Sequence, residues 1–475
     1  MTEKYEAVIG LEVHVELDTA SKIFCSCPTD FGALPNTNVC PVCMGLPGAL
    51  PTLNRRAVEL AIRAGLATEC EIARYTRFDR KNYFYPDLPK AYQISQFEYP
   101  LCSRGGVDIE VDGKQKRIGI TRIHMEEDAG KLIHSEDGTM IDYNRCGVPL
   151  IEIVSEPDIR SSAEAKAYLT ELRKILIYAG VSDCRMDKGS MRCDVNLSVR
   201  LNGASAMGER TEIKNVNSIA FVGKAIDYEF QRQIAVIEQG GEVFPETRRF
   251  DETDGKTHLM RRKESAADYR FFPEPDLAGF EVGEDKISEI KRELPMFPAE
   301  RRRIYEEQFG VSATDANIIT SHVLIADYFE KAARATAYPR LAANILLTEL
   351  MSELTDSVNE RNTLEPSVPS AYLAELATLY GEQTVNSSTV KKLIKMIAAE
   401  GVSPSELVEK YELAQINDGE YIACELHAVI KENPKLITDY RNGKLAAKKA
   451  IIGKVMARTA GRANPLILND IFDNM

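Results

Sequence analysis

The sequence predicts an α/β body followed by two helical parts. Up to about residue 290, short segments of alternating apolar and polar residues are separated by Gly, Pro and Asp, which is typical of β-strands. From Leu294–Pro298 onwards the apolar residues recur at helical spacing, and Ser403-Pro404-Ser405-Glu406 has the order of a helix N-cap and first turn. We therefore expect three domains, at residues 1–293, 294–407 and 408–475.

Within the body, one helix is predicted between Ser161 and Gly180. Ser161 and Glu164 form a capping box, and Gly180 ends the pattern. The apolar positions between them recur at helical spacing: Tyr168, Leu169, Leu172, Ile175 and Leu176. In the helical region, the clearest helical patterns span Ile318–Ala335 and Leu341–Leu354.

Composition narrows the class of protein. A chain of 475 residues with 44% hydrophobic and 28% charged residues is typical of a globular protein with several cores. The net charge of −13 argues against coating nucleic acid through general electrostatics. No apolar stretch approaches the roughly 18–20 residues of a membrane span, and MTEKYEAVIG lacks a signal-peptide layout. We expect a cytoplasmic protein without a membrane partner.

Four of the ten cysteines lie close together, as Cys25-Ser-Cys27 and Cys40-Pro-Val-Cys43. Two close-set pairs can converge on one Zn²⁺, and a tetrahedral site with four thiolates leaves no open position for chemistry. The spacing therefore predicts a structural zinc site that fixes an irregular loop. The alternative is a set of free or redox-active thiols.

Acidic residues recur within predicted strands. In LEVHVEL, Glu12, His14 and Glu16 occupy one parity, so a strand would place all three on one face. Glu152 lies in the apolar run PLIEIVSEP, where a buried carboxylate needs a cation or a donor. A third acidic segment, HMEED, spans residues 124–128, but parity does not decide which glutamate points inward. Such oxygen ligands suit Mg²⁺, and ion pairs with arginines are the alternative.

Arginine-rich segments accompany these carboxylates, although the chain has neither G-x-x-x-x-G-K-[ST] nor G-x-G-x-x-G. Arginines clamp phosphate oxygens, and carboxylates hold the Mg²⁺ used in phosphoryl transfer. A sheet lined with both predicts an ATP site without a P-loop, and each arginine taken alone is typical of a surface ion pair. The candidate phosphate ligands are Arg192, Arg200, Arg261 and Arg270.

Two further stretches suit RNA. FDRKNYFYP, at residues 78–86, interleaves aromatic and basic residues, which can stack bases or, equally, fill the core around tight turns. Residues 440–469 carry seven basic side chains and no acidic one, so they predict an RNA-backbone contact or a solvated helix face. The candidates for tRNA binding in this basic stretch are Lys444, Lys448, Lys449 and Arg458.

Several motifs together resemble the B subunits of the tRNA-dependent amidotransferases. They occur in the family's order and cover residues 1 to about 280: VIGLEVHVEL, FDRKNYFYPDLPKAYQISQ, GITRIHMEEDAGK, GVPLIEIVSEPDI, MRCDVNLSVR, EIKNVNS and DYRFFPEPDL. The helical end resembles the family more loosely, through its layout and Asn464-Pro465. The resemblance implies a cradle domain related to the glutamine synthetase and guanidino-kinase superfamily, then a helical domain and a tRNA-binding tail domain.

The resemblance also implies an activity. The chain would phosphorylate the side-chain carboxylate of Glu-tRNA(Gln) or Asp-tRNA(Asn) with ATP, and ammonia from glutamine would then displace the phosphate. An A subunit with glutaminase (amidase) activity and a small C subunit would complete a heterotrimer. Carried over to this chain, the catalytic magnesium ligands would be Glu12, His14, Glu127 and Glu152, while Glu126 and Glu156 stay undecided. The four cysteines would hold zinc, which some family members lack.

Two other interpretations are open from sequence alone. The chain would be a tRNA-binding and assembly protein if all chemistry lay in a partner. It would instead be a stand-alone carboxylate–amine ligase if it acted on a small molecule, although the basic tail and the aromatic stretch argue against this.

Overall fold

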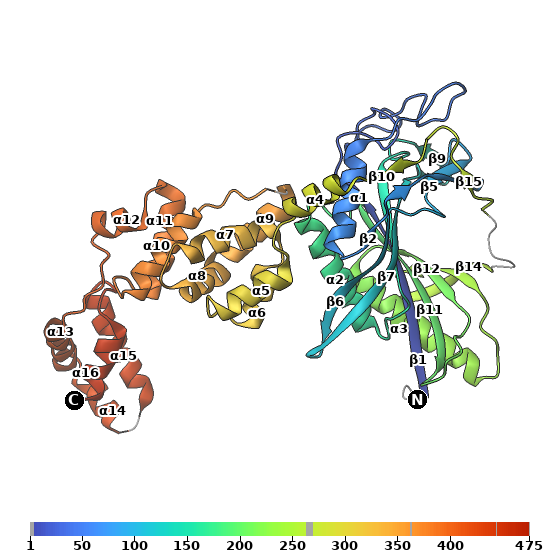
Figure 1. Ribbon diagram of the computed structural model, residues 1–475. Helices are drawn as coiled ribbons and strands as arrows, with labels where there is room; N and C mark the ends of the chain where they lie inside the picture. Colours follow the sequence, from blue (N-terminus) through green and yellow to red (C-terminus); the bar gives the residue numbers. More distant parts are fainter. Residues whose placement is uncertain (1–3, 263–268, 362, 443, 475) are drawn as a thin grey trace. The chain divides into compact units, whose positions relative to one another are not determined.

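The computed structural model describes residues 4–262, 269–361, 363–442 and 444–474 (Figure 1). Asp268, the first residue of the motif DYRFFPEPDL, lies outside the described residues. The chain divides into two compact units, Met1–Phe297 and Pro298–Met475. Among the described residues, no helix combines the length and apolar character that crossing a membrane would require.

The first unit is built on a nine-stranded mixed sheet in the order β14-β13-β12-β11-β1-β10-β7-β6-β2. Its neighbouring strands are antiparallel except for β12 and β13, which are parallel. In chain order the strands are β1 (Tyr5–Glu16), β2 (Glu71–Ile72), β6 (Cys102–Val111), β7 (Lys114–Glu127), β10 (Pro149–Ser155), β11 (Met191–Leu201), β12 (Thr211–Val216), β13 (Glu246–Asp251) and β14 (Lys256–Arg262).

Helices cover one face of this sheet (Figure 1). They are α1 (Arg55–Ala67), α2 (Ser162–Tyr178) and α3 (Ile219–Glu238), and α4 (Glu284–Glu293) packs on α1. On β1, Leu11, Val13 and Val15 are buried in the core beneath these helices. Glu12 and His14, which alternate with them, therefore lie on the opposite face, as their parity predicted. Ser161 is confirmed as the N-cap, because its Oγ accepts from Glu164 N at 3.1 Å, while the Glu164 carboxylate accepts from Arg160 N at 2.7 Å.

Two sequence motifs meet in a three-stranded sheet of β5 (Tyr92–Ser95), β4 (Asp79–Asn82) and β15 (Phe272–Pro273). Arg80 on β4 donates to the buried Glu274 carboxylate with Nε at 2.7 Å and Nη2 at 2.8 Å. FDRKNYFYP and DYRFFPEPDL thus lie side by side. Two short strand pairs complete the unit: β3 (Tyr75–Thr76) with β16 (Phe280–Glu281), and β8 (Lys131–Ser135) with β9 (Gly138–Asp142).

The described residues of the second unit form helices, as predicted. They are α5 (Pro298–Glu307), α6 (Ala313–Ile319), α7 (Val323–Arg334), α8 (Pro339–Ile345), the π-helix η2 (Leu346–Leu350), α9 (Met351–Arg361), α10 (Ser370–Gly381), α11 (Ser387–Glu400), α12 (Pro404–Lys410), α13 (Gly419–Glu432), α14 (Pro434–Arg441), α15 (Leu445–Arg458) and α16 (Pro465–Asp473).

These helices pack around two separate hydrophobic clusters. One extends from Tyr305 to Val408, and the other from Ile422 to Phe472. The boundary expected between residues 407 and 408 falls inside α12, whose Leu407 and Val408 both pack in the first cluster. Ser403 does cap α12, but a capping signal marks where a helix begins and not which core it joins.

Candidate metal centres and active site

The face of the nine-stranded sheet opposite α1, α2 and α3, here called the open face, holds three side chains that could bind a metal ion together, His14, Glu126 and Glu152. They come from the neighbouring strands β1, β7 and β10. His14 Nε2 lies 3.3 Å from Glu152 Oε2 and 3.6 Å from Glu126 Oε1. Their candidate ligand atoms all lie within 4.8 Å of one another, which is close enough to share one cation.

Without a cation, the protonated imidazole of His14 supplies the positive charge that faces Glu152 and Glu126. Burial alone would lower the pKa of His14, but its hydrogen bond to Glu152 and the charges of Glu152 and Glu126 raise that pKa to about 9. Burial opposes ionisation of Glu152, yet the charge of His124 and the hydrogen bond from His14 hold its pKa well below the usual range. The carboxylates are therefore ionised and already arranged to receive positive charge.

Two buried polar atoms at this group favour a bound ligand. Within the described residues, His124 Nδ1 and Glu126 Oε2 have no hydrogen-bond partner. A buried polar atom without a partner is costly, so such atoms usually mark a bound ion, water or substrate. The donor set of carboxylate oxygens and imidazole nitrogen fits a divalent cation such as Mg²⁺ or Mn²⁺.

A second group on the same face contains Glu12, Asp194 and Glu212. Glu12 and Asp194 are paired across β1 and β11, and Glu212 follows on β12. Lys214 Nζ lies 2.5 Å from Asp194 Oδ2 and 3.0 Å from Glu212 Oε1, while Asn196 donates to Glu12 Oε1 at 2.9 Å. This group thus contains three carboxylates and one ammonium, and a bound cation would neutralise the negative charge that remains.

Glu127, which was expected to be a magnesium ligand, does not lie in the group with His14 and Glu152. Strand β7 alternates its side chains, so Glu127 faces away from Glu126 and from His14. It forms a buried ion pair with Lys90 and accepts from Ile94 N at 2.9 Å. The structure therefore brings Glu126 to the group with His14 and Glu152, and Glu12 belongs to the second group. Of the four magnesium ligands expected from the sequence, His14 and Glu152 thus lie in the first group, Glu12 in the second and Glu127 in neither.

The four predicted arginines are spread over the unit. Arg192 forms an ion pair with the buried Asp128, and Arg200 donates to Glu6 Oε1 at 2.8 Å near the far end of β1. Arg261 is exposed on the edge strand β14, opposite Thr247. Arg270 lies beside β4, where its carbonyl oxygen accepts from Asn82. They form no single cluster because they belong to different strands and strand ends.

The aromatic stretch splits between core and surface. Phe78 is buried, whereas Phe84 is 80% exposed. Lys81 Nζ lies 5.1 Å from the ring centre of Tyr269 and 5.9 Å from that of Tyr83, and its charge acts on Glu126 and Glu152. One basic residue of the stretch therefore faces the first acidic group.

The four clustered cysteines converge, with Sγ atoms within 4.8 Å of one another. Cys40 and Cys43 have a 3.9 Å separation of their Sγ atoms, close to the roughly 3.8 Å expected when Zn–S bonds of about 2.3 Å form a tetrahedron. A hydrogen bond from Cys25 and the charge of Lys22 lower the pKa of Cys43 to about 4, against the effect of burial. The hydrogen bond to Cys43 raises the pKa of Cys25, and burial raises the pKa of Cys27, so Cys43 is the thiolate that the cluster offers first to a metal ion.

Lys22 is fully buried beside this cluster. Its Nζ donates to Asn38 O at 2.7 Å and to Tyr143 O at 3.4 Å, and lies 3.7 Å from Cys43 Sγ. A buried ammonium requires a compensating anion. A tetrathiolate zinc centre, with a net charge of about −2, would supply it.

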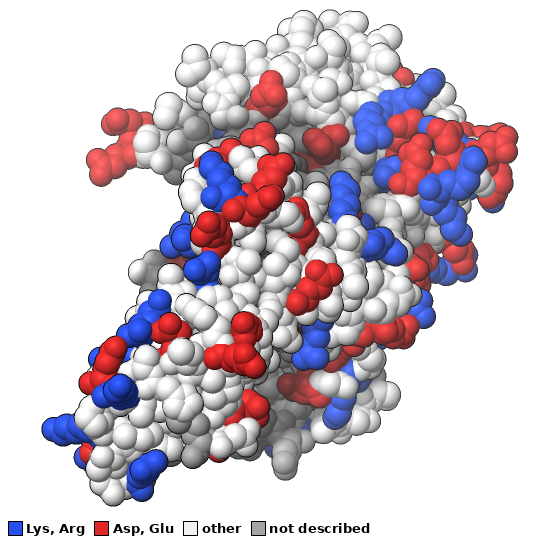
Figure 2. Space-filling view, turned by 90° about the vertical axis from the view of Figure 1, so that its left-hand side faces the viewer, with Lys and Arg blue, Asp and Glu red and all other residues white. Residues whose placement is uncertain are grey.

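Most of the predicted RNA ligands in the basic stretch at residues 440–469 form ion pairs with acidic side chains, which the sequence pattern did not indicate. Of the predicted RNA ligands, Lys444 is paired with Asp439, Lys448 with Asp473, and Arg458 with Glu425 and Glu432. These acids flank the basic stretch in sequence or come from α13. Lys449 is exposed. Basic and acidic side chains are interspersed over the face shown in Figure 2.

Comparison with known proteins decides the family. The family of the GatB/GatE catalytic domain matches residues 7–288, and that of the GatB domain matches residues 327–475. The B subunit of an aspartyl/glutamyl-tRNA(Asn/Gln) amidotransferase from Caldicellulosiruptor saccharolyticus is 50% identical over 471 residues, covering 98% of each chain. The chain belongs to this family of B subunits. Members from Thermoanaerobacter pseudethanolicus and Brevibacillus brevis are 51% and 46% identical, covering 98% and 99% of each chain.

Membership of this family confirms the resemblance drawn from the motifs. Sequence reasoning nevertheless missed Asp194 and Glu212 as partners of Glu12. The signal was present in MRCDVNLSVR, whose polar positions alternate like those of LEVHVEL. Only the pairing of β11 with β1, in which Glu12 lies opposite Asp194, shows that these positions share a face.

Proposed function

We propose that this chain is the component of an ATP-dependent aspartyl/glutamyl-tRNA amidotransferase that activates the side-chain carboxylate of Glu-tRNA(Gln), Asp-tRNA(Asn) or both. The observation that carries the proposal is the pair of acidic groups on one open sheet face, in a chain of this family. A glutaminase A subunit and a small C subunit are the proposed partners. The cradle is proposed to be related to glutamine synthetase and the guanidino kinases.

The reaction requires activation because a carboxylate is a poor electrophile. One carboxylate oxygen of the aminoacyl group attacks the γ-phosphorus of ATP, and the bond to ADP breaks. Ammonia then forms the C–N bond, the C–O bond to phosphate breaks, and the nitrogen loses a proton. Glutamine hydrolysis in the A subunit is the proposed source of the ammonia.

The two acidic groups are the proposed Mg²⁺ sites. His14, Glu126 and Glu152 would hold one ion, and Glu12, Asp194 and Glu212 would hold the other. Bound magnesium neutralises charge that develops on the phosphoryl oxygens. The chain's own contribution is to fix these carboxylates on adjacent strands, so that they need little rearrangement to accept the ions.

Basic residues next to the second group are proposed to contact the ATP phosphates. Register pairs Lys214 of β12 with Arg249 of β13, and Arg261 of β14 with Thr247. These side chains follow Glu212 toward the sheet edge. Arg261 thus keeps its proposed role, whereas Arg192 and Arg200 are paired with acids outside the second group and Arg270 lies in another sheet region.

The activity can be tested by trapping the activated carboxylate. The complete complex, given ATP and Glu-tRNA(Gln) without glutamine, is expected to form a hydroxamate with hydroxylamine. Glu12→Gln should remove most of this product, because the second group loses one of three carboxylates. A complex that forms hydroxamate equally well from free glutamate would be a small-molecule ligase, and one whose yield is unaffected by Glu12→Gln has its kinase site elsewhere.

The tail domain is proposed to bind the tRNA backbone through its exposed lysines. Lys449→Glu combined with Lys454→Glu should weaken tRNA binding and lower the salt slope by about one per lysine lost. Filter binding at several salt concentrations measures both. The control is Lys395→Glu on α11, also exposed but outside the tail. Equal weakening by the control would assign the effect to overall charge.

A further inference from the structure

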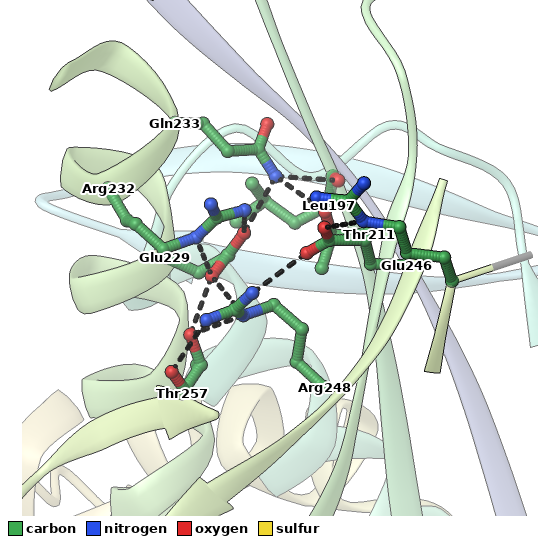
Figure 3. A network of polar contacts seen from close by, with 9 residues as sticks. Leu197, Thr211, Glu229, Arg232, Gln233, Glu246, Arg248 and Thr257 are labelled. Carbon is green, nitrogen blue, oxygen red and sulfur yellow. Dashed lines mark hydrogen bonds and ion pairs between the residues drawn. The ribbon is translucent and has the colours of Figure 1, made fainter. Parts of the chain in front are cut away.

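A buried polar network joins helix α3 to strands β12, β13 and β14 on the helix side of the sheet (Figure 3). Its centre is the Glu229 carboxylate on α3, which is fully buried. Glu229 accepts from Arg232 Nη2 at 2.6 Å, from Gln233 at 3.0 Å and from Thr257 at 2.7 Å. Gln233 also donates to Thr211 Oγ1 at 3.1 Å. Side chains of α3 are therefore hydrogen-bonded to residues of both β12 and β14.

Arg248 extends this network to β13 (Figure 3). It donates to Glu246 Oε2 at 2.8 Å and to Thr257 O at 2.8 Å, and its Nε lies 3.5 Å from Glu229. Glu246 and Arg248 flank Thr247 in sequence. The register of β13 with β14 shifts between Thr247 and Arg248, and the Thr247 side chain points to the opposite face, where it contacts the acidic group.

There Thr247 contacts a proposed magnesium ligand. Its side chain is only 2% exposed, and its Oγ1 donates to Glu212 Oε2 at 3.1 Å. The two residues are in register on the parallel strands β12 and β13. Lys214 holds the other oxygen of Glu212, so the Thr247 hydroxyl and the Lys214 ammonium together fix the carboxylate's orientation.

We propose that Thr247, held in place by the Glu229–Arg248 network, is a positioning residue for the cation site of Glu12, Asp194 and Glu212. The inference rests on the proposed function, since it assumes that this group binds Mg²⁺. Outer-shell hydrogen bonds orient metal-binding carboxylates, and their loss typically weakens metal binding about 10–100-fold. The network lies on the sheet face remote from the acids. Arg248 connects it to the strand that carries Thr247, and Gln233 connects it to Thr211, which precedes Glu212 on β12.

The test is a Mn²⁺ titration of the complete complex, followed by electron paramagnetic resonance. Wild type is expected to bind Mn²⁺ at two sites, and Glu212→Gln should remove one of them. Thr247→Val keeps the side-chain shape without the hydroxyl, and should raise the half-saturating Mn²⁺ concentration of that site about tenfold. Thr247→Ser, which keeps the hydroxyl, should stay close to wild type.

Glu229→Gln tests the network behind Thr247. It should raise the half-saturating Mn²⁺ concentration of the same site, and Ile226→Ala on the same helix is a destabilised control that lacks a network contact. Normal Mn²⁺ binding by Thr247→Val would overturn the positioning role, as would an equal shift in Ile226→Ala and Glu229→Gln at equal Tm. Wild type that binds no Mn²⁺ sensitive to Glu212→Gln would instead overturn the proposed cation site itself, and the inference with it.

Discussion

Glu126→Gln is expected to lower tRNA-stimulated ATP turnover of the complete complex about 100-fold or more. Glu126 supplies one of three candidate ligand side chains at the first group, where one of its oxygens is buried without a hydrogen-bond partner among the described residues. Loss of even an outer-shell partner typically weakens a metal site about 10–100-fold, so a direct ligand should lie at the upper end. Steady-state phosphate release, with and without Glu-tRNA(Gln), measures the effect.

The adjacent residue provides a matched control, because Glu127→Gln makes the same chemical change on the opposite face of the same strand. It removes the partner of Lys90, whose side chain is only 9% exposed, and this should destabilise the protein by about 3 kcal/mol. We expect Tm to fall by roughly 5–10 °C, while ATP turnover at low temperature persists. The double variant Lys90→Met/Glu127→Gln should recover part of the lost stability.

The smaller stability change is expected for Glu126→Gln. Its neighbour His14 can release a proton when the carboxylate is lost, whereas Lys90 has no such inexpensive response. If Glu127→Gln abolished turnover and Glu126→Gln spared it, the assignment of faces would be wrong. The two variants thus separate a ligand from a buried ion-pair partner.

The sequence could predict the face of an acidic residue only where alternating apolar residues showed which side of the strand is buried. In LEVHVEL, apolar residues at every second position fixed the face of Glu12 and His14. Just before the acids of HMEED, the parity of the apolar residues changes from Ile118 and Ile120 to Ile123 and Met125, so the sequence did not decide between Glu126 and Glu127. The structure decides through the register of β7 with β10, in which His124 lies opposite Glu152 and thereby places Glu126 on the same face.

Interactions between distant segments were the part that sequence could not provide. Asp194 and Glu212 join Glu12 only because β11, β1 and β12 are neighbours in the sheet. In the tail, residues 440–469 contain no acid, yet Arg458 meets Glu425 and Glu432 because α13 packs against α15. Charge runs are visible in sequence, but the acids that neutralise them come from other helices.

Cys43→Ala is expected to reduce bound zinc from about one ion per chain to nearly none. Four thiolates complete a tetrahedral site, so losing one opens the ion to water and to chelators. Cys43 is the most deeply buried of the four and carries the lowered pKa, so it should contribute strongly to the bound state. Metal analysis after dialysis against EDTA measures the change, and proteolysis of the loop at residues 17–54 should become faster.

Two variants determine whether this loss reflects metal binding or loop packing. Cys146→Ala removes a buried thiol that donates to Cys43 O and lies outside the four-sulfur group, so zinc should remain bound. Lys22→Met removes the ammonium beside Cys43, and because that charge offsets part of the roughly −2 on a tetrathiolate centre, zinc should be retained but released faster to EDTA. Since the site is closed, ATP turnover of Cys43→Ala at low temperature should persist. Equal zinc loss in Cys146→Ala would mean that the loop's packing, rather than its sulfur ligands, governs the metal.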